Sequence, residues 1–408
     1  MKKLLSLLVA AMMICSCLML TSCGTKKTAE TKTTEDSGNK APDVKLGFIC
    51  LHDENSTYDK NFIDAAKAAQ KELGLKDDQV LIKTNIPESA ECYEAAASLV
   101  DAGCNVIFAD SFGHEDYIIQ AAKEFPEVIF AHATGTKAHT ENLPNYFNAF
   151  ASIYEGRYIA GVAAGLKLQE MIDEGKITAD KAKMGYVGAY PYAEVKSGYT
   201  SFYLGARSIV PEATMEVKFT NSWFDIAAEK ETANALIADG CVLISQHADS
   251  EGAPKACEEA GVPNVAYNLD TREWGPNSAL ISSKINWTPY LVELLTCKQE
   301  GKTVVQDFCK GIADGSVELI GLNDKVAAKG TEEKLKEVEA KIKSGEIKVF
   351  DTKTFTVKGQ EITSYMADVD SDADFTPDTE VVSDGYFHES EKRSAPYFDL
   401  DIDGITIK

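Results

Sequence analysis

Short apolar runs alternate with amphipathic segments along most of this chain. Apolar runs at 44–49, 106–109 and 128–130 predict buried strands, and the segments between them, such as 62–73, carry apolar residues at helical spacing. The second half repeats the pattern, which predicts strands at 184–189, 214–219, 241–245 and 264–267 and helices at 193–208, 225–239 and 250–260. Continuous apolar strands separated by amphipathic helices are typical of parallel sheets that helices cover on both faces. The pattern therefore predicts the α/β class, with two doubly wound, Rossmann-like lobes.

The N-terminus predicts export and attachment to a lipid. Two lysines precede an apolar run from Leu4 to Leu20, which is short for a membrane span and typical of a signal peptide. The run ends in Leu20-Thr21-Ser22-Cys23, which resembles a bacterial lipobox, so we expect a signal peptide at 1–22 and a lipid on Cys23. An ordinary secretory signal, in which Cys23 has no role, is the alternative. Residues 23–43 are rich in Thr, Lys and acidic residues and are expected to form a flexible tether.

The net charge of the chain limits the classes of partner that it is expected to bind. Its 408 residues include 64 Asp and Glu against 41 Lys and Arg, which gives a net charge of −23 at pH 7. Nucleic-acid binding draws its affinity from Lys and Arg that neutralise phosphates, and anionic lipid surfaces attract basic patches. We therefore expect small molecules or proteins as partners, no nucleic acid, and membrane contact through the N-terminal lipid only. The protein is also expected to be a monomer.

The cysteines and acidic motifs predict no metal site. Beyond the signal peptide and Cys23, the cysteines form neither a CxxC pair nor a cluster with histidines, so zinc is not expected; they are Cys50, Cys92, Cys104, Cys241, Cys257, Cys297 and Cys309. The segment 368–372 resembles the start of an EF-hand loop, but Ala373 and Thr379 stand where that loop needs Gly and Glu. No metal or other cofactor is expected.

Polar and aromatic residues follow the expected strands of both halves. In open α/β sheets, ligands bind at the carboxyl ends of the strands. Any one carboxylate there can be a helix N-cap, but the recurrence of carboxylates beside aromatic or histidine residues in both halves favours a shared cleft. The candidate ligand-binding residues of this kind are Asn55, Tyr58, Asp110, Ser111, Phe112, Tyr190, Trp223, His247, Asp249, Asn268 and Asp270.

An enzyme is the rival class of function. The sequence contains no G-x-S-x-G elbow, Walker loop, HExxH or GxGxxG motif. His247, Asp249 and Ser250 are triad residue types, but neighbours this close in sequence rarely converge on one substrate atom. Paired carboxylates in a cleft also occur in glycosidases. We predict no catalytic residues, and a nucleoside-processing enzyme is the less favoured alternative.

Several motifs together resemble the basic-membrane-protein family, the lipoprotein substrate-binding subunits of purine-nucleoside ABC transporters. The resemblance covers roughly residues 44–345. It rests on Asp110-Ser111-Phe112-Gly113, Phe125-Pro126-Glu127-Val128-Ile129-Phe130, Tyr154-Glu155-Gly156-Arg157-Tyr158-Ile159-Ala160-Gly161, Gly205-Ala206-Arg207-Ser208, Asn221-Ser222-Trp223-Phe224-Asp225 and Gln246-His247-Ala248-Asp249-Ser250.

The resemblance implies a periplasmic-binding-protein type I fold, in which two lobes are joined by a three-segment hinge. It places the crossings near 147–150, 268–272 and 282–286. The first lobe would then comprise 44–148 and 271–284, and the second 149–270 and 285–350. Toward the C-terminus, the pattern predicts a helix at 332–343 and a strand at 347–350. Residues 351–408 are expected to form an acidic extension that packs on a lobe.

The resemblance also implies how a ligand is held. In the family, a purine base lies between aromatic rings, and an Asp and a Lys hold the ribose. Tyr58 matches the aromatic position, Asp110 the carboxylate of the second loop, Asp270 or Asn268 a later carboxylate, and Lys284 the lysine.

Two loops depart from the family pattern, at 54–58 and 247–250, so the ligand is left open. A purine nucleoside or nucleobase is predicted, with riboflavin or a sugar as alternatives. The resemblance implies ABC permease subunits as partners and a position on the extracytoplasmic face of the cell membrane. A ligand sensor with the same fold is the alternative to an importer subunit.

Overall fold

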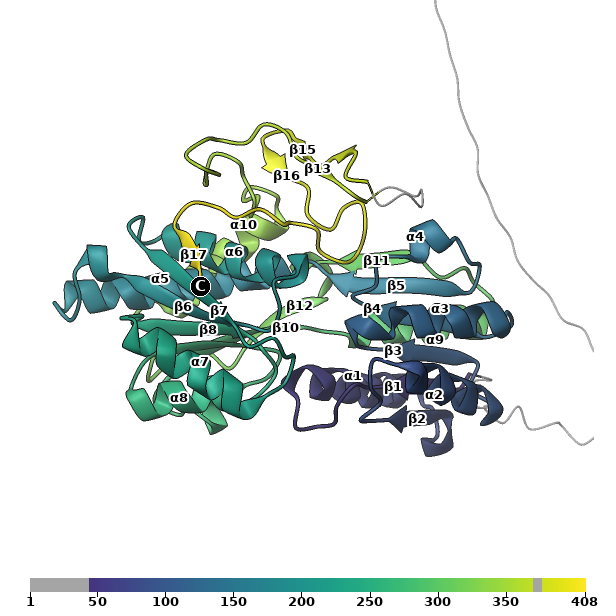
Figure 1. Ribbon diagram of the computed structural model, residues 1–408. Coiled ribbons are helices and arrows are strands. Elements are labelled where there is room, and N and C mark those ends of the chain that lie inside the picture. Colours follow the sequence, from purple (N-terminus) through teal and green to yellow (C-terminus); the bar gives the residue numbers. More distant parts are fainter. Residues whose placement is uncertain (1–43, 370–375) are drawn as a thin grey trace, which may run out of the picture. The chain divides into compact units, whose positions relative to one another are not determined.

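The computed structural model describes residues 44–369 and 376–408. The predicted signal peptide, Cys23 and the tether lie outside the described residues, as does part of the EF-hand-like segment. The described residues contain two large sheets, each covered by helices (Figure 1), and two small sheets of two strands each. The predicted class and the two doubly wound lobes are confirmed. Within the described ranges, no helix has the length and apolar character that crossing a membrane requires.

The first lobe is built on a sheet of parallel strands. Its order is β11-β5-β4-β3-β1-β2. The side chains alternate between two cores, with Phe48 and Phe108 on one face and Ile49 and Ile107 on the other. The strands are β1 (Leu46–Ile49), β2 (Val80–Lys83), β3 (Val106–Ala109), β4 (Ile129–Ala133), β5 (Tyr146–Ala151) and β11 (Asp307–Lys310).

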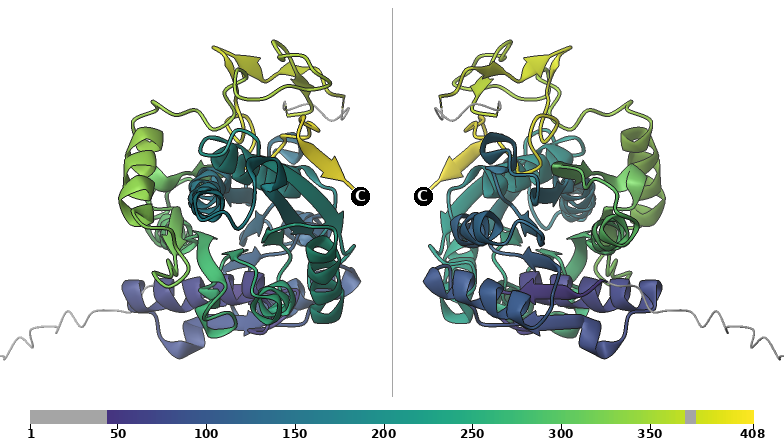
Figure 2. Two further views of the ribbon diagram at one scale, coloured as in Figure 1. Left: turned by 90° about the vertical axis from the view of Figure 1, so that its left-hand side faces the viewer. Right: turned by 90° about the vertical axis from the view of Figure 1, so that its right-hand side faces the viewer.

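Helices cover both faces of this sheet (Figure 2). α1 and α9 pack together over one face, and α2 and α3 over the other. The side chain of Ser56 caps α1 by accepting a hydrogen bond from the Asp59 amide, and Gly74 ends the helix in the left-handed region with φ of 66°. The helices are α1 (Thr57–Leu73), α2 (Ala90–Asp101), α3 (Glu115–Glu124), α4 (Ala138–Glu141) and α9 (Thr288–Glu300).

The second lobe contains a sheet of order β12-β10-β9-β8-β6-β7-β17. Its strands run parallel except β12, which is antiparallel to β10. The strands are β6 (Lys183–Gly188), β7 (Thr214–Phe219), β8 (Leu243–His247), β9 (Asn264–Tyr267), β10 (Ala279–Ile285), β12 (Val317–Ile320) and β17 (Ile405–Ile407).

Two helices of the second lobe approach each other unusually closely. A Cβ atom on Gly205 of α6 would lie 2.0 Å from the carbonyl oxygen of Tyr158 in α5. Likewise, a Cβ atom on Gly161 of α5 would lie 2.0 Å from the carbonyl oxygen of Phe202 in α6. Glycine therefore allows backbone contact at both positions. The helices are α5 (Ile153–Asp173), α6 (Ala193–Arg207), α7 (Ile226–Ala238), α8 (Gly252–Ala260) and α10 (Thr331–Lys343).

The crossings between the lobes differ from those predicted. The first crossing was predicted near 147–150, but these residues lie inside β5, so the chain crosses after that strand. The assignment of 271–284 to the first lobe is wrong, since β10 pairs with β9 and β12 in the second sheet, and no crossing occurs at 268–272. The chain returns to the first lobe after β10, beside the predicted 282–286, because α9 packs on α1 and β11 pairs with β5. It crosses again between β11 and β12.

The C-terminal extension contains short strands and contacts both lobes. The predicted helix at 332–343 is confirmed as α10, whereas the strand predicted at 347–350 is wrong: Phe350 instead stacks on Phe398 at a ring distance of 4.3 Å. The amide of Ser394 donates to Asp307 of β11, and Asp399 pairs with Lys196 of α6. The strands are β13 (Met366–Ala367), β14 (Thr379–Glu380), β15 (Val382–Ser383) and β16 (Tyr386–Phe387).

Candidate functional site

A pocket of about 340 Å³, a volume that includes its opening to solvent, lies between the lobes, where strands of both sheets end. Residues from both lobes line it, so a molecule inside contacts both. The lining residues are Leu51, His52, Tyr58, Asp59, Ser111, Phe112 and Thr134 from the first lobe, and Glu194, Trp223, His247 and Asp249 from the second.

Tyr58 is fixed as an aromatic wall of the pocket. It lies in the first turn of α1, and its hydroxyl donates to the Asp110 carbonyl oxygen at 2.8 Å. The edge of its ring meets Phe62, with ring centroids 4.9 Å apart. Burial, followed by the nearby charge of Glu194, raises the pKa of the Tyr58 phenol well above its usual range. The residue therefore offers a neutral, oriented ring to a ligand.

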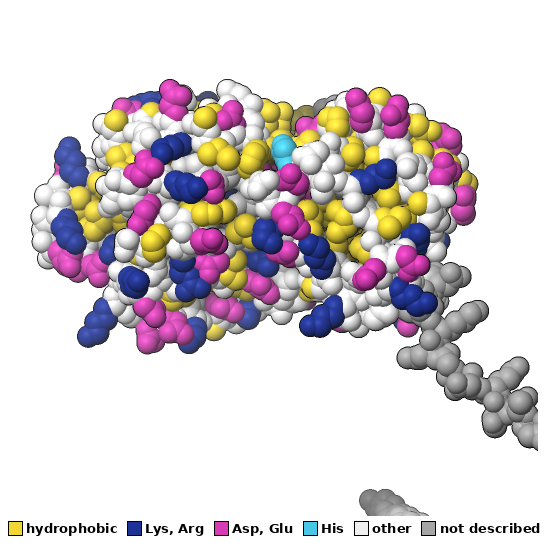
Figure 3. All heavy atoms as spheres, turned by 90° about the horizontal axis from the view of Figure 1, so that it is seen from below, with side chains coloured by type: hydrophobic (Ala, Val, Ile, Leu, Met, Phe, Trp, Pro, Cys, Tyr) yellow, Lys and Arg dark blue, Asp and Glu magenta, His cyan; other side chains and the backbone are white. Residues whose placement is uncertain are grey.

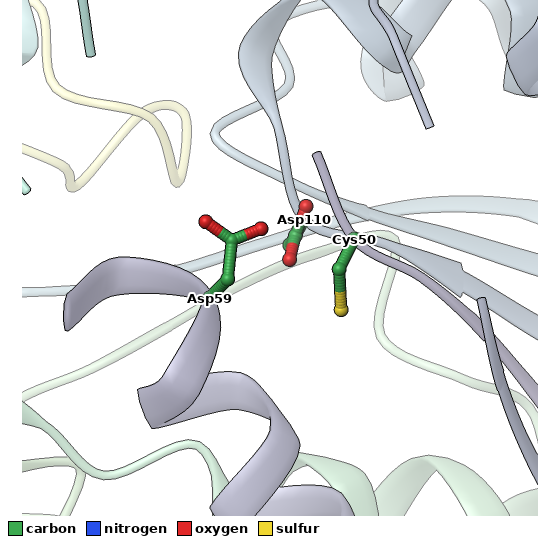
Figure 4. Close-up of side chains that lie close together, drawn as sticks. All are labelled: Cys50, Asp59 and Asp110. Carbon is green, nitrogen blue, oxygen red and sulfur yellow. The ribbon is translucent and has the colours of Figure 1, made fainter. Parts of the chain in front are cut away.

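Asp59 and Asp110 form an acidic pair next to Cys50 (Figure 4). Asp59 lines the pocket and accepts hydrogen bonds from the His52 amide at 2.8 Å and the Ser56 hydroxyl at 2.6 Å. Burial and then the charge of Asp59 raise the pKa of Asp110 well above its usual range. Asp59 is thus the member of the pair that presents an acceptor to the pocket.

The same cluster has the composition of a metal site. Candidate ligand atoms of Cys50, Asp59 and Asp110 lie within 4.8 Å of one another. Burial raises the pKa of the Cys50 thiol, and the charges of the two aspartates add to this effect. Since a metal binds the thiolate, metal binding here would have to release the proton that burial and these neighbours hold on the thiol.

In the second lobe, His247 and Glu194 form a polar pair at the pocket wall. The His247 Nε2 atom lies 3.3 Å from Oε1 of Glu194. Burial lowers the pKa of His247, and the positive charge of Arg157 lowers it further, while the hydrogen bond to Glu194 acts in the opposite direction. Arg157 is buried, donates to the Gln246 carbonyl oxygen at 2.8 Å and lies 3.7 Å above the ring of Tyr267. The histidine is therefore a neutral hydrogen-bonding group.

Aromatic residues of the second lobe continue the wall. Trp223 lines the pocket, and the edge of its ring system meets Tyr190 at 5.0 Å. Tyr190 stacks on Tyr192 at 5.2 Å, and Tyr192 reaches Phe112 of the first lobe at 5.4 Å. A row of rings thus passes from one lobe to the other.

The backbone at Thr134 is strained. This residue directly follows β4 and lines the pocket. Its φ of 64° is a conformation that is unfavourable for a β-branched side chain. Strain of this kind is often stored at functional sites.

Half of the predicted ligand-binding residues line the pocket, and others lie directly behind it. The lining ones are Tyr58, Ser111, Phe112, Trp223, His247 and Asp249. Asp110 and Tyr190 contact lining residues instead.

The remaining predicted residues lie outside the pocket lining. The Asn55 amide group donates to Asp53, and Asp270 pairs with Arg272. Lys284 is in β10 opposite Glu318 of β12. Asn268 accepts a hydrogen bond from Asn61 at 3.4 Å.

Five lining residues were not predicted: Leu51, His52, Asp59, Thr134 and Glu194. A signal existed for two of them. His52 lies three residues after the first strand, and Glu194 follows the aromatic pair Tyr190 and Tyr192. Asp59 gave no separate signal because an acidic residue in the first turn is also what a helix prefers for its own stability.

The comparisons with known proteins agree with this geometry. The family model described as "ABC transporter substrate-binding protein PnrA-like" (Bmp) matches residues 48–353. The chain belongs to this family. The resemblance seen in the sequence is thereby confirmed. As a member, this PnrA-like protein is an extracytoplasmic substrate-binding protein of an ABC transporter and not an enzyme.

Relatives of this PnrA-like protein carry different ligands in their names. It is 32% identical over 310 residues to a purine-binding protein of Brucella abortus, covering 75% of this chain and 83% of that protein. It is 36% identical over 211 residues to a protein of Haloferax volcanii provisionally named as an ABC transporter glucose-binding protein, covering 52% of this chain and 50% of that one.

Among solved structures, a solute-binding protein of an ABC transporter from Aeropyrum pernix matches with a TM-score of 0.61 at 17% identity. The match covers 75% of this chain and 93% of that one, and supports the fold alone. On the face in Figure 3, acidic and basic side chains of the described residues are interspersed.

Proposed function

We propose that this protein binds a purine base or nucleoside between its lobes and delivers it to the permease of an ABC importer. The observation that carries the proposal is a pocket with an aromatic ring from each lobe, Tyr58 and Trp223, among polar groups. A flat heterocycle gains about 0.5–1.5 kcal/mol from each favourable ring pair beyond the burial of its area.

The polar groups suit the edge of a purine. Asp59 offers carboxylate oxygens to ring or amino N–H donors, and His247 adds a nitrogen that donates or accepts according to its tautomer. Hydrogen bonds to a charged acceptor are roughly twice as strong as neutral ones. The purine-binding name of the Brucella abortus relative supports the same ligand class.

Isothermal titration of the purified protein tests the ligand class. The panel comprises adenine, guanine, adenosine, guanosine, riboflavin and glucose, and chromatography of the mixture checks that the ligand is unchanged. We expect stoichiometric binding of purines. Glucose is the second candidate, because the Haloferax volcanii relative carries that ligand in its name. Binding of glucose or riboflavin without any purine would overturn the purine proposal.

We further propose that Cys23 carries a lipid that anchors the mature protein. The apolar run and the Leu20-Thr21-Ser22-Cys23 sequence support this proposal. In the Cys23→Ala variant, lipoprotein signal peptidase should fail to cleave the precursor, and labelled fatty acid should not be incorporated. Cys17→Ala, which changes a cysteine inside the apolar run, is the matched control. Normal processing of Cys23→Ala would contradict the anchor.

An import role, as opposed to a sensor role, is tested in the cells that make the protein. Deletion of its gene should reduce uptake of the labelled purine that binds best, and the wild-type gene should restore it. Unchanged uptake with altered gene expression would favour the sensor.

A further inference from the structure

Two backbone amides of the loop between β4 and α4 donate to a buried carboxylate, that of Glu115. This residue lies in the first turn of α3 with 5% of its surface exposed. Its Oε1 atom accepts hydrogen bonds from the amide of Thr136 at 2.8 Å and from that of Lys137 at 2.9 Å. One charged acceptor therefore holds two consecutive loop amides, and hydrogen bonds of this kind are about twice as strong as neutral ones.

The carboxylate of Glu115 is itself fixed by the neighbouring strand. The Tyr146 hydroxyl donates to the same Oε1 atom at 2.9 Å, and Nδ2 of Asn148 donates to it at 3.3 Å. Both residues are buried in β5. Asn148 also accepts a hydrogen bond at 2.7 Å from the amide of Ala138, where α4 begins. Glu115 therefore links the start of α3, the strand β5 and the loop.

Gly135 allows the loop to lie directly against this network. A Cβ atom at this position would lie 1.9 Å from Nδ2 of Asn148 and 2.6 Å from both Oε1 of Glu115 and Nδ1 of His132. A side chain has no room there, so the close approach of the loop backbone to the carboxylate requires glycine.

The residue that precedes this glycine is the strained Thr134 of the pocket wall, with φ of 64°. Such a conformation persists only where the surrounding structure determines it. Before the strained residue, its amide donates to the Ala149 carbonyl oxygen at 3.2 Å and its hydroxyl to that of Ala133. After it, the bonds from Thr136 and the next residue to Glu115 hold the chain. The two sets of bonds together fix Thr134 between them.

We propose that Glu115 is a positioning residue of the ligand site, which holds Thr134 at the pocket wall through the loop and thereby sets the affinity for the ligand without touching it. Glu115 itself lies outside the lining that the described residues form. The inference rests on the proposed function for the identity of the ligand. The loop geometry is present whichever small molecule binds.

A double-mutant cycle tests whether Glu115 acts through Thr134. Glu115→Ala removes the acceptor of the loop amides, and we expect the dissociation constant of adenosine or guanosine, whichever binds better, to rise about tenfold. Thr134→Gly removes the strain, because glycine adopts positive φ without a steric penalty. In the Thr134→Gly background, Glu115→Ala should therefore raise the dissociation constant by less than about threefold. Titration calorimetry of the four proteins measures this coupling.

Two controls separate positioning from a general loss of structure. Glu115→Gln keeps an oxygen that can accept from the loop amides, so its affinity should stay within about threefold of the wild type. Asp116→Asn changes the next residue of α3, whose carboxylate pairs with the Lys137 side chain and not with a loop amide, and should leave the affinity unchanged. If Glu115→Ala does not fold, Glu115→Asp replaces it, since its carboxylate is one carbon shorter and keeps the charge.

Hydrogen–deuterium exchange with mass spectrometry follows the loop without any ligand. The segment 131–135, which includes the Thr134 amide bonded to Ala149, should exchange faster in Glu115→Ala than in the wild type. Thr134→Gly should reverse this increase. Unchanged exchange in Glu115→Ala, or equal losses of affinity with and without Thr134→Gly, would overturn the positioning role while leaving purine binding intact. Absence of adenosine and guanosine binding by the wild type would instead overturn the proposed function, and the exchange comparison would still decide the role of Glu115 in the loop.

Discussion

The backbone amide of Thr57 donates a hydrogen bond to the carbonyl oxygen of Asp249 at 2.8 Å. Thr57 begins α1 of the first lobe, and Asp249 follows β8 of the second. The Asp249 amide in turn donates to the Trp223 carbonyl oxygen at 2.9 Å. A continuous backbone connection therefore joins the helix that carries Tyr58 to the loop that carries Trp223, and the structure is that of lobes closed on the pocket.

The first prediction concerns lobe closure. A ligand that touches Tyr58 and Trp223 stabilises only the closed arrangement, so its binding should shift the population toward that arrangement. Small-angle X-ray scattering should give a smaller radius of gyration with saturating purine than without it. An unchanged radius would mean that the lobes are already closed in the free protein.

The second prediction concerns Tyr58. Tyr58→Ala removes a ring face and should weaken purine binding on the order of tenfold or more. Tyr58→Phe keeps the ring and loses only the hydrogen bond to the Asp110 carbonyl oxygen, so its affinity should stay within about threefold of the wild type. Titration calorimetry measures both. If Tyr58→Phe were as weak as Tyr58→Ala, the hydroxyl and not the ring face would be the important group.

The third prediction concerns Lys284, which the family resemblance matches to the lysine that holds the ribose, and Asp270, which together with Asn268 is a candidate for the later carboxylate. Asp270 pairs with Arg272, and Lys284 faces Glu318 across two strands, so neither lines the pocket. Lys284→Ala and Asp270→Ala should therefore change nucleoside affinity by less than about threefold. A selective loss of nucleoside over base in Lys284→Ala would restore the original assignment.

The fourth prediction concerns pH. Burial raises the pKa of Glu229 in α7 from 4.5 to about 7, although its hydrogen bonds with Ser250 and Asp225 act in the opposite direction. Between these values the folded state retains a proton that the unfolded state has lost. The contribution of Glu229 to stability is therefore complete below pH 4.5, falls as the pH rises to about 7 and is constant above that.

Denaturant unfolding at about pH 5 and pH 8 measures this contribution. The wild-type free energy of unfolding should decrease more between these conditions than that of Glu229→Gln, by up to about 3 kcal/mol. Because other groups titrate in both proteins, the difference between the two proteins isolates Glu229. Equal decreases would show that Glu229 is ionised in the folded state.

Local structure was predictable because its signals are local. The helix predicted at 193–208 is α6, and the strand predicted at 264–267 is β9. The lobe to which β10 belongs was not predictable, because an apolar run fits either sheet and only its pairing with β9 decides. β11 gave little signal, since its four residues, Asp307–Lys310, include two charged ones.

The residues of the candidate site likewise divide into those with a local signal in the sequence and those without one. Tyr58, Trp223 and His247 were predicted because they lie where strands end, and parallel strands bring such ends to one edge of a sheet. Asp59 lies within the first turn of α1, where acidic residues serve the helix itself, and only the folded chain shows that it also faces the pocket. The packing of the extension on the first lobe depends on contacts between residues far apart in sequence, such as Ser394 with Asp307.

The pairing of β17 with β7 also bears on solubility. The residues of β17 occupy the hydrogen-bonding side of β7 that no other strand of the described ranges covers, and Lys408 adds an ion pair with Glu216 at 3.0 Å. A chain that stopped before Ile405 would present the free N–H and C=O groups of β7 to neighbouring molecules, and such an uncovered edge is a template for intermolecular strand addition. The pairing of β17 with β7 is therefore expected to limit aggregation. A variant that lacks β17 would expose this edge of the sheet.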